Sequence, residues 1–274
     1  MRKKLIKSLI FTFALIIVII ELIPVILLSL TSIKTNMAIW TSPTPFHPFR
    51  PTMEQYIGVF RETTFVKNIF NSTYIAFWTT FLSVLGGALA SYALARFPLK
   101  RKREISLGII FTRMIPQIAL AVPIYYMFRK IGLLDTYTGM ILAHTTFNLP
   151  YVVWLLLPFF QKVPKEFEEA ALIDGCSYIK VFTKIFLPLA SSGIIVAIIF
   201  CFLGSWNDFI YTLVLSNVKT TTAPMLVTTF VGMYAPEVGK MSAAGILIIL
   251  PVFILALALQ RYIILGLSGG GIKG

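Results

Sequence analysis

The chain has 274 residues, of which 57% are hydrophobic and 13% charged, and its mean hydropathy is +0.85. Soluble globular domains carry about 25% charged residues, so this composition excludes an ordinary soluble protein and indicates a membrane protein. The formal net charge is +13. Because the basic residues are spread over several loops, the charge indicates membrane orientation and not a nucleic-acid surface.

The first element is an apolar run over residues 9–30 that follows Arg2, Lys3, Lys4 and Lys7. A signal peptide has an apolar region of about 7–15 residues and ends in a small-residue cleavage site. This run is longer and has no convincing site. We therefore expect an N-terminal cytoplasmic segment and an uncleaved first transmembrane helix within residues 1–30.

Five further segments are long and apolar enough to cross a bilayer, which takes about 20 residues in a helix. They cover residues 72–95, 105–128, 138–160, 187–215 and 241–265. None alternates as a barrel strand would, so we predict an all-α membrane protein with six spans. An extracytoplasmic loop is expected at 31–71, a permease core of five helices at 72–265 with a loop at 161–187, and a tail at 266–274.

The distribution of Lys and Arg sets the expected orientation. Fifteen of the 24 fall on the side of the two termini, eight on the other side and one, Arg113, inside a span. This surplus predicts that both termini are cytoplasmic. No internal repeat is visible, so a second half of any transport pathway is expected in another subunit.

The loop at 161–187 contains an acidic helix. Pro164 suits its first turn, Glu166, Glu168 and Glu169 complement the positive end of its dipole, and Gly175 suits the left-handed position that ends it. The face that repeats at helical spacing carries one bulky side chain and two methyl groups, a shape that fits a groove on another protein. Its residues are Phe167, Ala170, Ala171 and Asp174.

A second apolar stripe follows, made of Tyr178, Val181, Phe182 and Ile185. Lys180 and Lys184 lie away from it. This pattern is typical of a helix in the membrane interface, and Leu187-Pro188 is expected to turn the chain into the fifth span. An ordinary amphipathic loop is the alternative interpretation of both stripes.

These residues resemble the coupling-loop signature of ABC importer permeases. The signature stands here as Glu169-Ala170-Ala171, Gly175, Ile185 and Leu187-Pro188 with the family's spacing. Segments 132–136, 205–209, 260–262 and 266–274 resemble those of MalG-type permeases of carbohydrate importers. The likeness runs from about Pro51 to the last residue. The sequence departs from the family at Cys176 and in lacking a proline after Leu187-Pro188, which predicts a straighter start to the fifth span.

The resemblance implies a type I ABC importer permease fold, in which the helix around Glu169 docks into a cytoplasmic ATPase. The implied partners are a second permease of six or more spans, two ATPase subunits and an extracytoplasmic solute-binding protein. ATP and Mg would be bound by the ATPases and no cofactor by this chain. The resemblance also implies ATPase contacts for Gly270, Lys273 and Gly274, and binding-protein contacts for Met233, Tyr234, Ala235, Pro236 and Glu237.

Polar residues inside the spans are candidates for the solute pathway, because hydroxyl-rich ligands need hydrogen-bond partners and aromatic rings stack on sugars. The candidates are His144, Thr145, Asn148, Ser205, Trp206, Asn207, Asp208 and Tyr211. Hydrogen bonds between helices are the alternative. Glu21 and Arg113 are charged within spans and are expected to be paired or functional. Pro116, Pro123, Pro150 and Pro158 are expected to kink their helices.

The sequence does not favour an enzyme. His47 and His144 are its two histidines, no metal-binding spacing is found, and no phosphate-binding loop of the Gly-x-x-x-x-Gly-Lys-Ser/Thr kind is present. A channel would leave the docking helix without a purpose. We therefore expect a permease for a sugar such as maltose or trehalose, with a non-sugar solute such as glycerol phosphate as the alternative.

Overall fold

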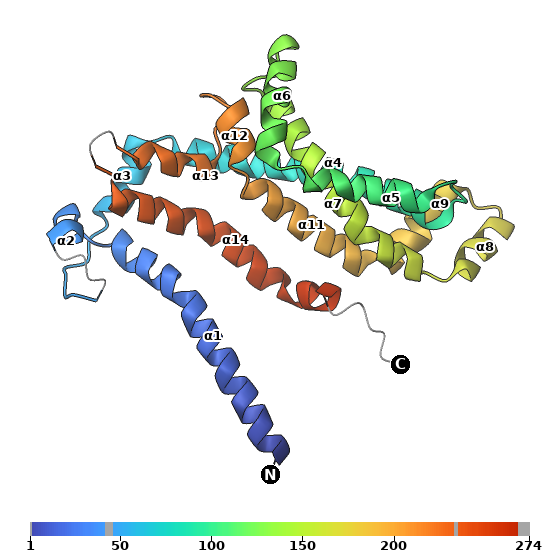
Figure 1. Ribbon diagram of the computed structural model, residues 1–274, viewed down its shortest axis with the longest axis horizontal. Helices are drawn as coiled ribbons and strands as arrows, with labels where there is room; N and C mark the ends of the chain where they lie inside the picture. The colour runs from blue at the N-terminus through green and yellow to red at the C-terminus, as the bar shows by residue number, and fades with distance from the viewer. Residues whose placement is uncertain (1, 42–45, 233–234, 268–274) are drawn as a thin grey trace. The chain divides into compact units, whose positions relative to one another are not determined.

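The structure is a computed structural model that describes residues 2–41, 46–232 and 235–267 (Figure 1). These residues form helices and no strand. They divide into two compact units: unit 1 comprises Met1–Lys67 and Leu226–Pro251, and unit 2 comprises Asn68–Met225 and Val252–Gly274.

Unit 1 holds α1 (Arg2–Ser32), α2 (Asn36–Thr41), α3 (Glu54–Glu62), η3 (Val227–Phe230) and the start of α14 (Val238–Leu267). Gln55 of α3 donates to the carbonyl of Lys34 over 3.0 Å and to Oδ1 of Asn36 over 2.9 Å. Lys240 of α14 forms ion pairs with Glu62 and Glu237. No residue in the most hydrophobic stretch of α1 is buried.

Unit 2 is built around α4 (Phe65–Arg96) and α7 (Tyr137–Lys162). Its other elements are α5 (Lys102–Phe111), η1 (Thr112–Met114), α6 (Gln117–Lys130), α8 (Lys165–Ile173), α9 (Tyr178–Val181), η2 (Phe182–Phe186), α10 (Leu187–Leu189), α11 (Ser191–Trp206), α12 (Ile210–Leu215) and α13 (Ala223–Leu226). Helix α11 packs along α7, and α12 packs against α6 and α7.

Four helices of the described residues are long and apolar enough to span a membrane, or up to six if each of two bent pairs counts as one span. The unbent ones are α1, α4, α7 and α14, which match four of the predicted spans. The six-span prediction therefore holds when each bent pair is one span.

The third predicted span is bent by 90° between η1 and α6. Ile115 is extended there (φ −74°, ψ 123°) and Pro116 precedes α6. A proline pushes the preceding residue out of the helical region, so the predicted kink at Pro116 is confirmed.

The fifth predicted span bends two residues after Pro188, close to the turn expected at Leu187-Pro188; whether it begins straighter than in the family stays a prediction. The chain bends by 81° between α10 and α11, at Ala190 (φ −95°, ψ 12°). Phe182 and Phe186 before the bend are buried in one cluster, while α11 after it packs along α7. Residues on both sides of the bend, including Ala197 and Cys201 of α11, belong to this one cluster, so packing holds the bend without a second proline.

Candidate functional site

Helix α8 presents an open outer face. It follows Pro164, and its first turn carries Glu166 and Glu168. The Phe167 side chain is 52% exposed, Glu169, Ala170 and Asp174 are also exposed, and Ala171 is half-buried. The structure thus places the predicted docking face at the surface of unit 2, at the end where α5 and α9 also lie (Figure 1).

The end of α8 is closed by Gly175, which adopts φ +80° as the sequence predicts. The amide of Gly175 donates to the carbonyl of Leu172 (3.1 Å), and that of Cys176 to the carbonyl of Ala171 (2.9 Å). This pair of bonds is the Schellman motif, which satisfies the last carbonyls of a helix. A side chain at position 175 would be strained, because only glycine adopts a positive φ at little cost.

Glu168 holds the inner face of α8 against the protein. The sequence alone predicts only that this residue complements the positive end of the helix dipole. Its carboxylate accepts a hydrogen bond from the Tyr92 hydroxyl (3.2 Å) and lies 3.5 Å from Nε of Arg96. The Arg96 and Glu168 side chains are only 5% and 12% exposed. A buried carboxylate needs such partners, so this contact fixes α8 to the end of α4.

Arg96 also joins other elements. Its guanidinium donates to the carbonyls of Phe160 (3.0 Å) and Val163 at the end of α7 and lies 4.5 Å from the ring centroid of Phe186. We call Tyr92, Arg96 and Glu168 the α8 clamp. In the sequence, Arg96 is a basic residue at the end of an apolar span, a pattern that predicts only membrane orientation.

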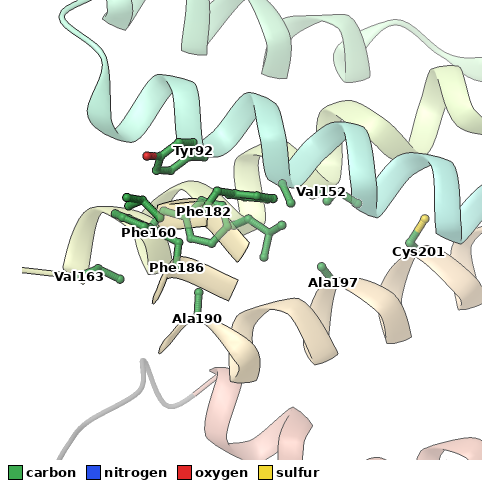
Figure 2. Packing of buried hydrophobic residues seen from close by; sticks show 12 residues of the cluster. Tyr92, Val152, Phe160, Val163, Phe182, Phe186, Ala190, Ala197 and Cys201 are labelled. Carbon is green, nitrogen blue, oxygen red and sulfur yellow. The ribbon is translucent and has the colours of Figure 1, made fainter. Parts of the chain in front are cut away.

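The stripe predicted for the membrane interface is instead largely packed inside the protein, and that interpretation is wrong. Val181 and Phe182 are buried and Ile185 packs on the same cluster, while Tyr178 is 51% exposed. Figure 2 shows Phe182 and Phe186 gathered with Tyr92 and Phe160. Tyr92 lies 4.8 Å from Phe186 between ring centroids. Leu187 packs on this cluster and Pro188 is exposed. The protein core thus covers the apolar stripe.

Four of the eight predicted pathway residues, His144, Ser205, Asp208 and Tyr211, form a buried polar cluster. Nδ1 of His144 lies 2.7 Å from the Ser205 hydroxyl, and its Nε2 lies 3.4 Å from Asp208. Asp208 also accepts from the amide of Tyr211 (3.0 Å), which caps the start of α12. Trp206 and Tyr211 are buried too, and Thr145 bonds the carbonyl of Ile141 within its own helix.

Two of the predicted pathway residues, Asn148 and Asn207, border a niche of about 350 Å³ in unit 2. We call it the Arg113 niche. It is lined by Arg113, Asn148, Tyr151, Phe200, Leu203, Gly204 and Asn207. These lining residues come from the bend of the third span, from α7, and from α11 and the residue directly after it. Whether these residues line a solute pathway stays a prediction at this point.

Asp135, in the loop between α6 and α7, anchors the segment that follows α12. Its carboxylate accepts hydrogen bonds from the amides of Asn217, Val218, Lys219 and Thr220 and from the Thr220 hydroxyl. Burial alone would raise the pKa of Asp135, but these donors outweigh it and lower the pKa from 3.8 to about 2. Nothing in the sequence indicated this anchor beyond a segment that resembles the family.

The remaining predictions are only partly covered by the structure. Ala235 and Pro236 are exposed and Glu237 is half-buried; Met233 and Tyr234 lie outside the described residues. So do Gly270, Lys273 and Gly274 of the tail. Glu21 is exposed on α1 and belongs to unit 1, whereas Arg113 belongs to unit 2, so a pair between them stays a prediction.

Bent spans around a polar cluster, with an outward helix clamped to their ends, define a membrane transport subunit. Residues 83–268 match the family described as "Binding-protein-dependent transport system inner membrane component". The chain belongs to this family. It is a multi-pass membrane protein and the permease component of an ABC importer, a non-enzymatic subunit whose ATPase is a separate chain.

Two curated relatives are similar over most of the chain. The trehalose transport system permease protein SugB of Mycobacterium tuberculosis is 36% identical over 230 residues, which is 83% of this chain and 84% of SugB. The sulfoquinovosyl glycerol transport system permease protein SmoH of Agrobacterium fabrum is 35% identical over 269 residues, which is 98% of this chain and 94% of SmoH.

Among solved structures, the fold is similar to a chain of a bacterial ABC transporter involved in the import of the acidic polysaccharide alginate. The TM-score is 0.79 with 22% identity, over 96% of this chain and 98% of that one. This likeness establishes the type I ABC importer permease fold.

Proposed function

We propose that this chain is one of two permeases of a binding-protein-dependent sugar importer, and that α8 receives the force of ATP hydrolysis. The observation that carries the proposal is the form of α8: an open face with Phe167 and Ala170 outside, and a buried ion pair inside. The names of the relatives SugB and SmoH, which specify trehalose and sulfoquinovosyl glycerol, support a sugar as the solute.

In this proposal the outer face of α8 lies in a groove of one ATPase subunit. Phe167 fills the groove, the small Ala170 and Ala171 allow close approach, and Glu169 pairs with a basic residue of the ATPase. The α8 clamp then passes displacement of α8 to the ends of α4 and α7. Because the clamp is buried and bonded on several sides, α8 and the two spans would move as one body.

The remaining partners follow from the same proposal. In this proposal both termini lie in the cytoplasm, with the tail residues Gly270, Lys273 and Gly274 near the ATPases. The loop at 233–237 lies outside and contacts the solute-binding protein. A second permease completes the pathway, and two ATPase subunits bind ATP and Mg.

The test is reconstitution of the purified complex in liposomes with its binding protein. We expect this chain to co-purify with an ATPase and a second permease, and to accumulate labelled sugar when ATP is supplied. The test panel includes trehalose and sulfoquinovosyl glycerol as sugars and glycerol 3-phosphate as a non-sugar solute. Uptake by this chain alone, or of glycerol phosphate only, would refute the proposal.

A further inference from the structure

The Arg113 niche has an unusual composition for a place within membrane spans. A permanent cation lies at the 90° bend between η1 and α6, and the amides of Asn148 and Asn207 line the same hollow. A charged side chain at membrane depth is costly, and such residues face a protein interior or a water-filled path where they have a partner.

The guanidinium of Arg113 is held in place by two rings. It lies 4.0 Å from the ring centroid of Phe147 and 4.6 Å from that of Tyr151, which are four residues apart on α7 and share one face. Contacts of this kind fix the plane of the guanidinium and leave its N–H edges available.

No hydrogen bond or ion pair of these edges is found within the described residues of unit 2. The ion pairs found there join Arg96 to Glu168 and His144 to Asp208, and neither includes Arg113. A guanidinium is a planar fork of five donors that matches carboxylate, sulfonate or phosphate oxygens two at a time. Within unit 2, Arg113 is therefore a fixed hydrogen-bond donor that can bind an anionic group.

Asn148, on the same helix as the two rings, and Asn207 supply acceptors to the niche. The Asn148 amide donates to the carbonyl of His144 over 3.0 Å, which directs its Oδ1 towards Gly204. A Cβ atom added at Gly204 would lie 2.8 Å from that oxygen, so the glycine keeps the niche open beside it. Hydroxyl groups both donate and accept, and a wall with amide oxygens and amide N–H groups suits them.

We propose that the Arg113 niche is a solute subsite of this chain and that it takes acidic saccharides. The guanidinium of Arg113 binds the carboxylate or sulfonate of the solute, while Asn148 and Asn207 bind its hydroxyl groups. This inference rests on the proposed function, since it assigns the class of sugar that the permease accepts.

The experiment uses the intact importer complex in lipid nanodiscs, without ATP or binding protein. Sulfoquinovosyl glycerol serves as the acidic probe and trehalose as the neutral probe, each measured by saturation-transfer NMR titration. We expect the wild type to bind the acidic probe at least about tenfold more tightly, an energy of about 1.4 kcal/mol. Arg113→Gln should bring the ratio of the two affinities close to one, and Arg113→Lys should lower it because lysine lacks the fork.

Gly204→Ala should weaken the binding of both probes, because the added methyl group collides with Asn148. The matched control is Gly108→Ala, since an added Cβ at that helical glycine meets nothing within 4 Å. This control should bind both probes as the wild type does. Thermal unfolding of each variant complex shows whether it remains folded.

Three results would overturn the inference: a wild type that binds trehalose more tightly, an affinity ratio that Arg113→Gln leaves unchanged, or loss of the second permease from the purified Arg113→Gln complex. The last result would mean that a carboxylate of the partner permease occupies the niche. Because the titration needs no ATP, its failure is distinct from failure of the proposed function, which appears as absent ATP-driven uptake by the wild type.

Discussion

Arg96 is the residue on which the position of α8 depends most. It forms an ion pair with Glu168, donates to two carbonyls at the end of α7 and lies over the ring of Phe186. Arginine suits this position because its planar donors serve several acceptors at once. Glu168 has fewer partners, so it depends on Arg96 and Tyr92 for its burial.

Breaking this pair should therefore cost stability. Removing one partner of a buried ion pair leaves the other charge buried, at about 3–5 kcal/mol, so Arg96→Gln and Glu168→Gln should each lower the thermal stability of the purified complex. The double variant should recover part of the loss, because neither charge then remains buried. Glu166→Gln, on the exposed face of the same helix, is the control. Equal unfolding temperatures for Arg96→Gln and Glu166→Gln would show that the clamp does not hold α8.

At the scale of elements, the sequence predicts the helices well and their bends less well. The length of the apolar segments predicts α1, α4, α7 and α14, and Pro116 predicts the bend of the third span. The bend at Ala190 lies two residues after Pro188, where the sequence predicts a turn, but the sequence does not reveal that Phe182 and Phe186 before the bend and Ala197 after it are buried in one cluster.

The same limit applies to the candidate site. Helical spacing predicts the outer face of α8. The ease with which glycine adopts the left-handed conformation predicts that the helix ends at Gly175. The inner contact of Glu168 with Arg96 joins residues that are far apart in the sequence, and helical periodicity within either segment cannot reveal it. Contacts of this range become visible only when the helices are placed together.

Asp135 joins two elements that are distant in sequence, and its effect should depend on pH. Its pKa in the folded chain, about 2, is below the ordinary value of 3.8. A depressed pKa stabilises the fold above the ordinary value, and that contribution is lost as the pH falls towards the folded pKa. The stability advantage of wild type over Asp135→Ala should thus be full at neutral pH and shrink between about pH 4 and pH 2.

Chemical denaturation of both proteins across this pH range measures that advantage. The residues from Asn217 to Thr220 are not changed in this comparison, so the donors of the loop remain in place in the variant. A difference between the two proteins that stays constant down to pH 2 would contradict an ionised Asp135 as the anchor.

At the scale of the whole molecule, the chain is one subunit of a larger transport complex. As the membrane component of a binding-protein-dependent system it hydrolyses no ATP, so the energy for uptake has to enter through a contact with another subunit. Helix α8 combines an exposed face with a buried attachment to two spans. It is therefore the proposed point of entry.

The most direct measurement is the number of sugar molecules accumulated per ATP hydrolysed in proteoliposomes carrying Glu169→Lys. Glu104→Lys is the matched control, because it makes the same charge change at an exposed residue of α5. We expect Glu169→Lys to lower this ratio at least about tenfold, because like charges facing each other across an interface cost several kcal/mol, while Glu104→Lys leaves it unchanged. A wild-type ratio in the Glu169→Lys complex would contradict the claim that ATP acts on the spans through α8.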